Sequence, residues 1–192
     1  MNYPNNIKKD THKINYGNRG MGLEHDLNDT NNYYLQNNIA VIHKKPTPIT
    51  IVSVDYKSRK DAVIKEAYFK TPSTTDYNGV YKEKYIDFEA KETKNKQGFP
   101  LINIHAHQLE HLKSVSNAGG IAFLIIRFTA FAETYLIDAN KFLNYINIYN
   151  KKNIPIKFFK DNGHILKEKY NPRLDYLSII DKFYLKGDSY EK

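Results

Sequence analysis

Residues 121–128, with the sequence IAFLIIRF, constrain the fold of this chain more than any other segment. Seven of these eight residues are apolar, so the segment has no polar face to turn toward water. Such a run is typical of a strand in a sheet that is covered on both faces, because one wet face would require polar residues at alternate positions. The segment therefore predicts a central strand with other elements packed on both sides of its sheet.

The other hydrophobic patterns supply the layers that such a strand needs. Helical spacing indicates three helices, and short apolar runs between turn residues indicate five more strands. Their order favours an α/β fold in which a mixed central sheet is flanked by helices. The helices are expected at residues 22–37, 101–116 and 140–150, the strands at 39–43, 50–58, 62–70, 85–92 and 133–139, and a polar loop at 73–84.

The chain divides into an arm and a folded region. Residues 1–18 are polar and irregular, and they predict a flexible basic arm. Residues 19–192 contain no linker or internal repeat, and they are expected to form a single domain. Within it, two neighbouring strands pair and form a hairpin insertion at about residues 50–71. An isolated hairpin is only marginally stable in water, so this one requires support from a partner surface.

Charge and composition limit the classes of function. The chain has 29 lysine and arginine residues against 21 acidic ones, a net charge of +8, which favours polyanionic partners, although the lysine-rich composition of AT-rich genomes explains the same excess. The absence of cysteine excludes a disulfide scaffold, a thiolate zinc site and a cysteine nucleophile. No apolar run of 18 residues and no signal-peptide core occurs, so we expect a cytoplasmic protein without a membrane span.

The strand at residues 85–92 carries an acid and a base at alternate positions. Glu89 and Lys91 share one face, because successive side chains of a strand point to opposite sides. A carboxylate and an ammonium group are costly in a buried strand unless they are paired or bind a metal ion. The expected polar face consists of Tyr85, Asp87, Glu89 and Lys91, and the expected apolar face of Ile86, Phe88 and Ala90.

Asp76, Glu89 and Lys91 have the spacing Asp-x₁₂-Glu-x-Lys, which is that of the PD-(D/E)xK nucleases. Two carboxylates bind a hard divalent cation through oxygen, and the cation activates water and neutralises a scissile phosphate. A neighbouring lysine stabilises the charge that develops on the phosphate. The pattern alone is weak, because many chains contain Glu-x-Lys by chance, and an ordinary surface strand with an ion pair is its more common explanation.

Four longer segments resemble the RecU family of Holliday-junction resolvases, in the family's order. The resemblance runs from Asn18 to about Asp181. It implies a restriction-endonuclease-like core with a protruding hairpin stalk, working as a homodimer in DNA recombination and repair. The four segments are NRGMGLEHDLNDTNNYYL, STTDYNGVYKEKYIDFEAKET, FPLINIHAHQLEHL and NPRLDYLSIID.

The resemblance also implies an activity, a cofactor and partners. The activity is symmetric nicking of four-way DNA junctions with Mg²⁺, for which Mn²⁺ can substitute. Thr74, Asp76, Glu89 and Gln108 are implied as metal-site residues, with Lys91 as the residue that stabilises the transition state. RecA and the RuvAB branch-migration motor are implied as further partners. A non-catalytic DNA-binding protein that modulates a recombinase is the alternative.

Basic and aromatic side chains alternate along the hairpin. Basic residues neutralise phosphates and aromatic rings stack on unpaired bases, whereas lysines that only guard the strand edges explain the same pattern. The resemblance assigns this hairpin to the open centre of a junction, where two stalks would bury their apolar faces against each other. The expected DNA-binding residues of the hairpin are Lys57, Arg59, Lys60, Lys65, Lys70, Tyr68 and Phe69. Arg19, just before the first helix, is a further expected DNA-binding residue, unless it is only a flexible-loop arginine.

Several other side chains leave two interpretations open. Gln108, on the inward stripe of its helix, is either a packing residue or a metal ligand. Glu24 either faces solvent or reaches the metal site through water. Glu83 stands where many family members are expected to have glycine, and its charge beside a DNA-facing loop is expected to weaken affinity. His107, Glu110 and His111 spell the H-x-x-E-H pattern of inverted zinc peptidases. The alternative is that the histidines at positions 105, 107 and 111 hydrogen-bond locally or contact DNA.

Overall fold

A six-stranded mixed sheet forms the centre of the computed structural model, which describes residues 22–56, 58, 60, 62–70 and 74–185. Its strands are β1 (Val41–Lys44), β4 (Tyr77–Tyr81), β5 (Lys84–Thr93), β7 (Ile121–Phe128), β8 (Glu133–Asp138) and β10 (His164–Ile165). The strand order is β1-β4-β5-β7-β8-β10. β5 and β7 pair in parallel, and the other neighbours are antiparallel. The predicted α/β fold with a mixed central sheet is confirmed.

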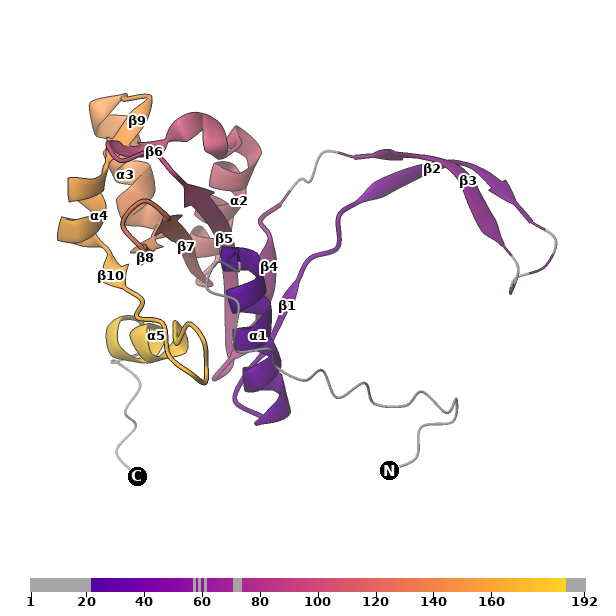
Figure 1. Ribbon diagram of the computed structural model, residues 1–192, viewed down its shortest axis with the longest axis horizontal. Helices are drawn as coiled ribbons and strands as arrows, with labels where there is room; N and C mark the ends of the chain where they lie inside the picture. The colour runs from indigo at the N-terminus through magenta and orange to yellow at the C-terminus, as the bar shows by residue number, and fades with distance from the viewer. Residues whose placement is uncertain (1–21, 57, 59, 61, 71–73, 186–192) are drawn as a thin grey trace.

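Helices cover both faces of this sheet (Figure 1). One face packs against α1 (Leu23–Gln36) and α5 (Leu177–Phe183), and the other against α2 (Ala106–Asn117), α3 (Ala139–Tyr149) and α4 (Ile156–Asn162). β7 contributes to both cores, because Phe123 and Ile125 point to the first and Leu124 and Ile126 to the second. Every residue of β7 is buried, as its apolar sequence predicts. No described helix has the length and apolar character that a membrane crossing requires.

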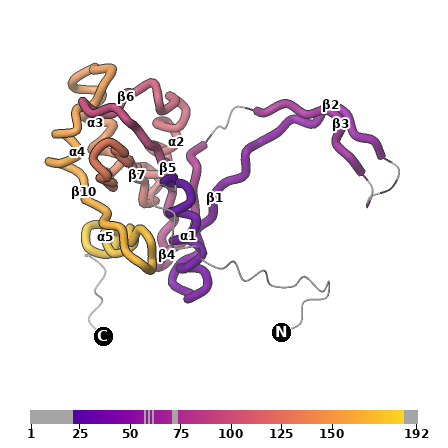
Figure 2. The backbone as a smooth tube through the Cα atoms, viewed as in Figure 1, coloured from indigo at the N-terminus to yellow at the C-terminus, as the bar shows by residue number. Residues whose placement is uncertain are grey.

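The strands β2 (Ile49–Asp55) and β3 (Val63–Phe69) form an antiparallel hairpin that projects away from the central sheet (Figures 1 and 2). The predicted hairpin is thus confirmed. Its apolar side chains are exposed along both strands, with Ile51 at 49% and Val63 at 60%. Since a two-stranded hairpin without cover is marginally stable, this surface is a candidate for burial against another molecule.

The segment between β5 and α2 differs from the sequence prediction. β6 (Gly98–Pro100) pairs with β9 (Asn153–Pro155), and a 3₁₀ turn, η1 (Leu101–Asn103), follows it. The backbone amide of Leu101 donates to the carbonyl of Lys152, so this residue continues the β6–β9 contact instead of starting a helix. Ile104 and His105 are extended, and α2 begins only at Ala106. The predicted helical start at residue 101 is therefore wrong.

The predicted polar loop at residues 73–84 is also wrong, because it contains β4. Gly79 allows this strand to approach β1, since a Cβ atom at this position would lie 2.0 Å from the carbonyl oxygen of Val41. A two-residue turn then joins β4 to β5, with Lys82 at φ 46° and Glu83 at φ 63°. Positive φ at both central residues is the geometry of a tight hairpin turn that favours glycine. This explains why glycine is expected at position 83.

Candidate active site

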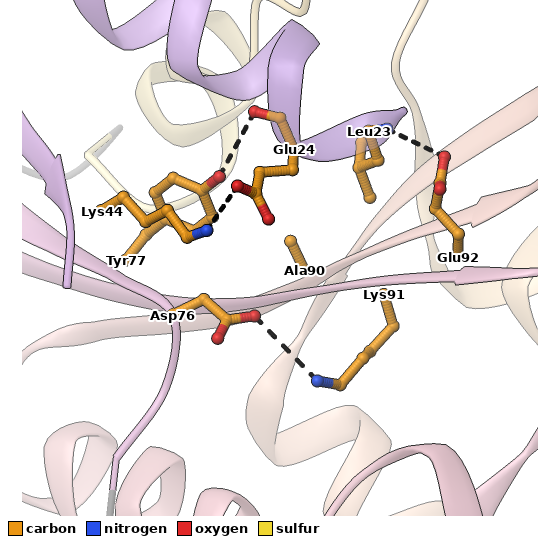
Figure 3. A pocket seen from close by; sticks show the side chains of 8 residues that line it. All are labelled: Leu23, Glu24, Lys44, Asp76, Tyr77, Ala90, Lys91 and Glu92. Atoms are coloured by element: carbon orange, nitrogen blue, oxygen red, sulfur yellow. Dashed lines mark hydrogen bonds and ion pairs between the residues drawn. The ribbon is translucent and has the colours of Figure 1, made fainter. Parts of the chain in front are cut away.

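Asp76, Glu89 and Lys91 converge on the face of β5 that looks toward α2. Glu89 and Lys91 come from β5, and Asp76 directly precedes β4, whose Tyr77 pairs with Phe88. The Asp76 amide donates to Glu89 Oε2 at 3.2 Å. Lys91 Nζ lies 2.5 Å from Glu89 Oε1 and 4.0 Å from Asp76 Oδ2, and Figure 3 shows Asp76 and Lys91 pointing toward each other. The structure thus brings together the three residues that the spacing singles out.

Glu89 is a buried carboxylate whose bonding is incomplete. Its side chain is fully buried. Burial, together with the charge of Asp76, raises the pKa of the Glu89 carboxyl from 4.5 to about 8, against the opposing effect of Lys91. Although Oε1 contacts Lys91, it accepts no well-directed hydrogen bond from the described residues. A buried oxygen with this deficit, beside a second carboxylate, fits a divalent cation, because such an ion would supply the missing partner.

A solvent-open pocket of about 190 Å³ lies beside these residues. Glu24 of α1 reaches into it and forms an ion pair with Lys44 of β1 (Figure 3). Glu92 accepts a hydrogen bond from the Leu23 amide at 2.8 Å and so fixes the start of α1. No local pattern in the sequence points to Lys44 or Glu92, because their elements meet only in the folded chain. The pocket is lined by Leu23, Glu24, Lys44, Asp76, Tyr77, Ala90, Lys91 and Glu92.

The other two expected metal-site residues are Thr74 and Gln108, and neither takes part in the contacts that join Asp76, Glu89 and Lys91. Gln108 is buried on α2, but its side-chain oxygen accepts a hydrogen bond from the His105 amide at 3.0 Å. Thr74 is half-buried just before Thr75 and Asp76. Among the described residues, neither side chain is hydrogen-bonded to Asp76, Glu89 or Lys91. A role for either in holding a cation therefore stays a prediction.

The three histidines of the α2 region do not form a metal cluster. His105 and His107 stack with their ring centroids 5.4 Å apart, while His111 Nε2 lies 3.1 Å from Asp87 Oδ2. Within the described ranges, no group of three or more histidine, aspartate or glutamate side chains is arranged to hold a metal ion. His107 and His111 thus have separate partners, and the zinc-peptidase pattern gains no support from their positions.

The expected DNA-binding residues lie on the exposed hairpin where the structure describes them. Lys65 pairs with Asp55 at 3.0 Å, Tyr68 donates to Glu66 at 2.6 Å, and Phe69 is 86% exposed. Lys60 and Lys70 are also exposed. Arg19, Lys57, Arg59 and the arm at residues 1–18 lie outside the described residues.

A mixed sheet flanked by helices that brings two carboxylates and a lysine together beside an open pocket is typical of divalent-metal-dependent nucleases of the PD-(D/E)xK type. The family model described as RecU, Recombination protein U, matches residues 18–182. The chain therefore belongs to the RecU family, as the sequence resemblance indicates.

Comparisons with individual proteins agree with this family. A Holliday junction resolvase RecU from Bacillus mycoides (strain KBAB4) is 58% identical over 181 residues, covering 93% of this chain and 88% of the relative. The protein of the same name from Bacillus cytotoxicus is 57% identical over 175 residues, covering 90% and 88%. The solved structure of Archaeoglobus fulgidus Hjc, a Holliday junction resolvase, aligns with 72% of this chain and 90% of its own, at 12% identity and a TM-score of 0.42.

Proposed function

We propose that this protein resolves four-way DNA junctions by hydrolysing phosphodiester bonds at Asp76, Glu89 and Lys91, with Mg²⁺ as the cofactor and Mn²⁺ as a substitute. The observation that supports this most strongly is the convergence of these three side chains beside an open pocket. The relatives named as Holliday junction resolvases, which match most of the chain, supply the substrate class. Because the named relatives are bacterial proteins and a bacterial chromosome lies in the cytoplasm, we expect this protein to act there.

Each residue of the site has a distinct part in this chemistry. Asp76 and Glu89 would hold the cation through carboxylate oxygens, the ligand type that hard cations prefer. When bound, the cation lowers the pKa of a coordinated water and neutralises charge on the phosphate. Lys91, which Glu89 holds in place at 2.5 Å, donates to a phosphate oxygen and stabilises the charge that develops there. The open pocket gives the DNA backbone access to Asp76 and Lys91.

The active unit in this proposal is a homodimer. A four-way junction has approximate two-fold symmetry, so two active sites related by a dyad would nick two strands symmetrically. The exposed apolar side chains of the hairpin support this, since the partner's hairpin would bury them. The same hairpin carries lysines and the exposed ring of Phe69 into the junction. RecA and the RuvAB motor belong to the proposal as partners, and co-sedimentation with each of them is the test.

The deciding experiment compares a synthetic four-way junction with a linear duplex of the same sequence, with and without Mg²⁺. The wild-type protein should nick the junction symmetrically, only with Mg²⁺, and leave the duplex largely intact. Asp76→Asn and Lys91→Ala should lower the cleavage rate by at least ~100-fold while junction binding changes little. Glu110→Gln, on the exposed surface of α2, is the matched control and should cleave normally.

Two results would refute the proposal in different ways. A wild-type protein that binds the junction but cuts nothing with either cation would exclude the nuclease function. Normal cleavage by Asp76→Asn would retain the function but show that the site is wrong.

A further inference from the structure

Asp87 is a buried carboxylate that the proposed reaction does not use. It lies on β5, shares a face with Glu89, and is fully buried. Burial opposes its ionisation, but hydrogen bonds outweigh this effect and hold the pKa of Asp87 below its usual value. Its oxygens are therefore charged and satisfied within the protein. The partners are Lys45 Nζ and Tyr85 Oη, each at 2.8 Å, His111 Nε2 at 3.1 Å, and Thr75 Oγ1.

Two of these partners come from opposite ends of the hairpin. Lys45 follows β1 and leads into β2, whereas Thr75 lies between β3 and β4. Lys45 Nζ donates to Thr75 Oγ1 at 2.9 Å as well as to Asp87. We call these three residues, Lys45, Thr75 and Asp87, the neck. Lys45 and Thr75 lie on the two connections between hairpin and sheet, and Asp87 on β5 accepts a hydrogen bond from each.

The neck also holds the backbone of Asp76. The Lys45 amide donates to the Asp76 carbonyl at 2.7 Å, and Thr75 directly precedes Asp76 in the chain. The Asp76 amide in turn donates to Glu89 Oε2. The backbone of Asp76 is thus held through its carbonyl by Lys45, at the base of the hairpin, and through its amide by Glu89 of the candidate metal site.

We propose that the neck is a positioning device that couples the hairpin to Asp76, so that efficient cleavage requires Lys45 and Asp87 although neither touches the substrate. The proposal rests on the proposed nuclease site at Asp76, Glu89 and Lys91. Removing the Lys45 charge leaves Asp87 buried without its cation, and the segment must shift to bring water to it. A displacement of roughly 1 Å at a catalytic group lowers a rate by up to ~100-fold.

His111 extends the same device to α2. His111 lies on α2, one turn after Gln108, and its ring is hydrogen-bonded to Asp87. The carboxylate therefore ties together β5, the Asp76 segment and α2. This arrangement explains why a charged group is retained in a position where an apolar side chain would otherwise pack.

The test uses Lys45→Met, which keeps the length of the side chain and removes its charge. The kcat for junction cleavage should fall by roughly 10- to 100-fold, and the Mg²⁺ concentration for half-maximal rate should rise by at least about fivefold. KM and the cation-free junction Kd should stay within about twofold of wild type, because no DNA contact is removed. Lys45→Arg, which keeps the charge, should retain more kcat than Lys45→Met.

Thr75→Val is the second variant, because it preserves the shape of the side chain and removes only the hydroxyl. It should raise the Mg²⁺ requirement in the same direction, by a smaller factor. Lys157→Met is the matched control, since Lys157 pairs with Asp161 on the exposed surface of α4, and it should behave as wild type.

Measuring wild-type protein and Asp76→Asn in the same assay separates failure of the proposed nuclease site from failure of the proposed positioning role of the neck. If Asp76→Asn cleaves normally, the proposed site fails. If Asp76→Asn is inactive while Lys45→Met and Thr75→Val keep the wild-type kcat and Mg²⁺ requirement, the neck has no positioning role. Loss confined to junction affinity would also overturn the proposal.

Discussion

Replacing Glu89 by glutamine should stabilise the metal-free protein at alkaline pH. The folded-state pKa of Glu89 is raised from 4.5 to about 8, so the folded protein binds more protons than the unfolded chain between these values. The free energy of unfolding must therefore fall as the pH rises through this interval, and the full cost is present above about pH 8. Glutamine has no charge to desolvate and avoids this cost.

The magnitude follows from the same two values. At about 1.36 kcal/mol per pH unit, the interval from 4.5 to about 8 corresponds to an upper limit of ~5 kcal/mol. Water entry and relaxation around the charge reduce the realised cost, and the buried amide needs partners of its own. The free energy of unfolding of Glu89→Gln minus that of wild type should therefore increase by about 2–4 kcal/mol when the pH is raised from about 5 to about 9.

Urea denaturation in the presence of EDTA measures this difference directly. Wild type and Glu89→Gln are compared at about pH 5 and about pH 9, with Glu110→Gln on the exposed face of α2 as the matched control. The control should show the same stability difference from wild type at both pH values. If the stability difference between Glu89→Gln and wild type also stays constant within ~0.5 kcal/mol, Glu89 does not carry the cost inferred from its burial.

Three further outcomes can be measured. Glu83→Gly should raise the free energy of unfolding by about 1 kcal/mol because φ at Glu83 is 63°, while Glu110→Gly in α2 should lower it by a similar amount; equal effects would contradict the turn geometry. Gly79→Ala should lower stability by more than ~3 kcal/mol in urea denaturation, since the new methyl group meets the Val41 carbonyl; a change below ~1 kcal/mol would show that the strands separate freely. Calorimetry should show Mn²⁺ affinity rising by up to roughly tenfold per pH unit toward pH 8 and then levelling off, because Glu89 must lose its proton to bind; affinity independent of pH would exclude this ligand.

The sequence predicts the parts of the fold whose patterns are local. β7 is found at its predicted residues, because a strand covered on both faces needs an uninterrupted apolar run. β4 is missed because its sequence YNGVY, read by itself, is that of a polar turn, and only the approach of β1 explains its glycine. The start of α2 is misplaced because a tertiary contact to Lys152 fixes the residues before it.

The candidate site divides in the same way. Alternation along β5 is sufficient to place Glu89 and Lys91 on one face, and the spacing brings in Asp76. Alternation also puts Asp87 on that face. The sequence around Asp87 does not show that Lys45, which directly follows β1, pairs with its charge. Partners that meet only through the tertiary fold leave no mark in a single sequence.

The central claim is that Asp76 and Glu89 together hold the divalent cation used for cleavage, and direct titration of Mn²⁺ tests it without relying on activity. Calorimetry at about pH 8 should show Mn²⁺ binding to the wild-type protein, and at least ~10-fold weaker binding to Asp76→Asn and to Glu89→Gln. Equal Mn²⁺ affinity in all three proteins would place the cation elsewhere and contradict the account.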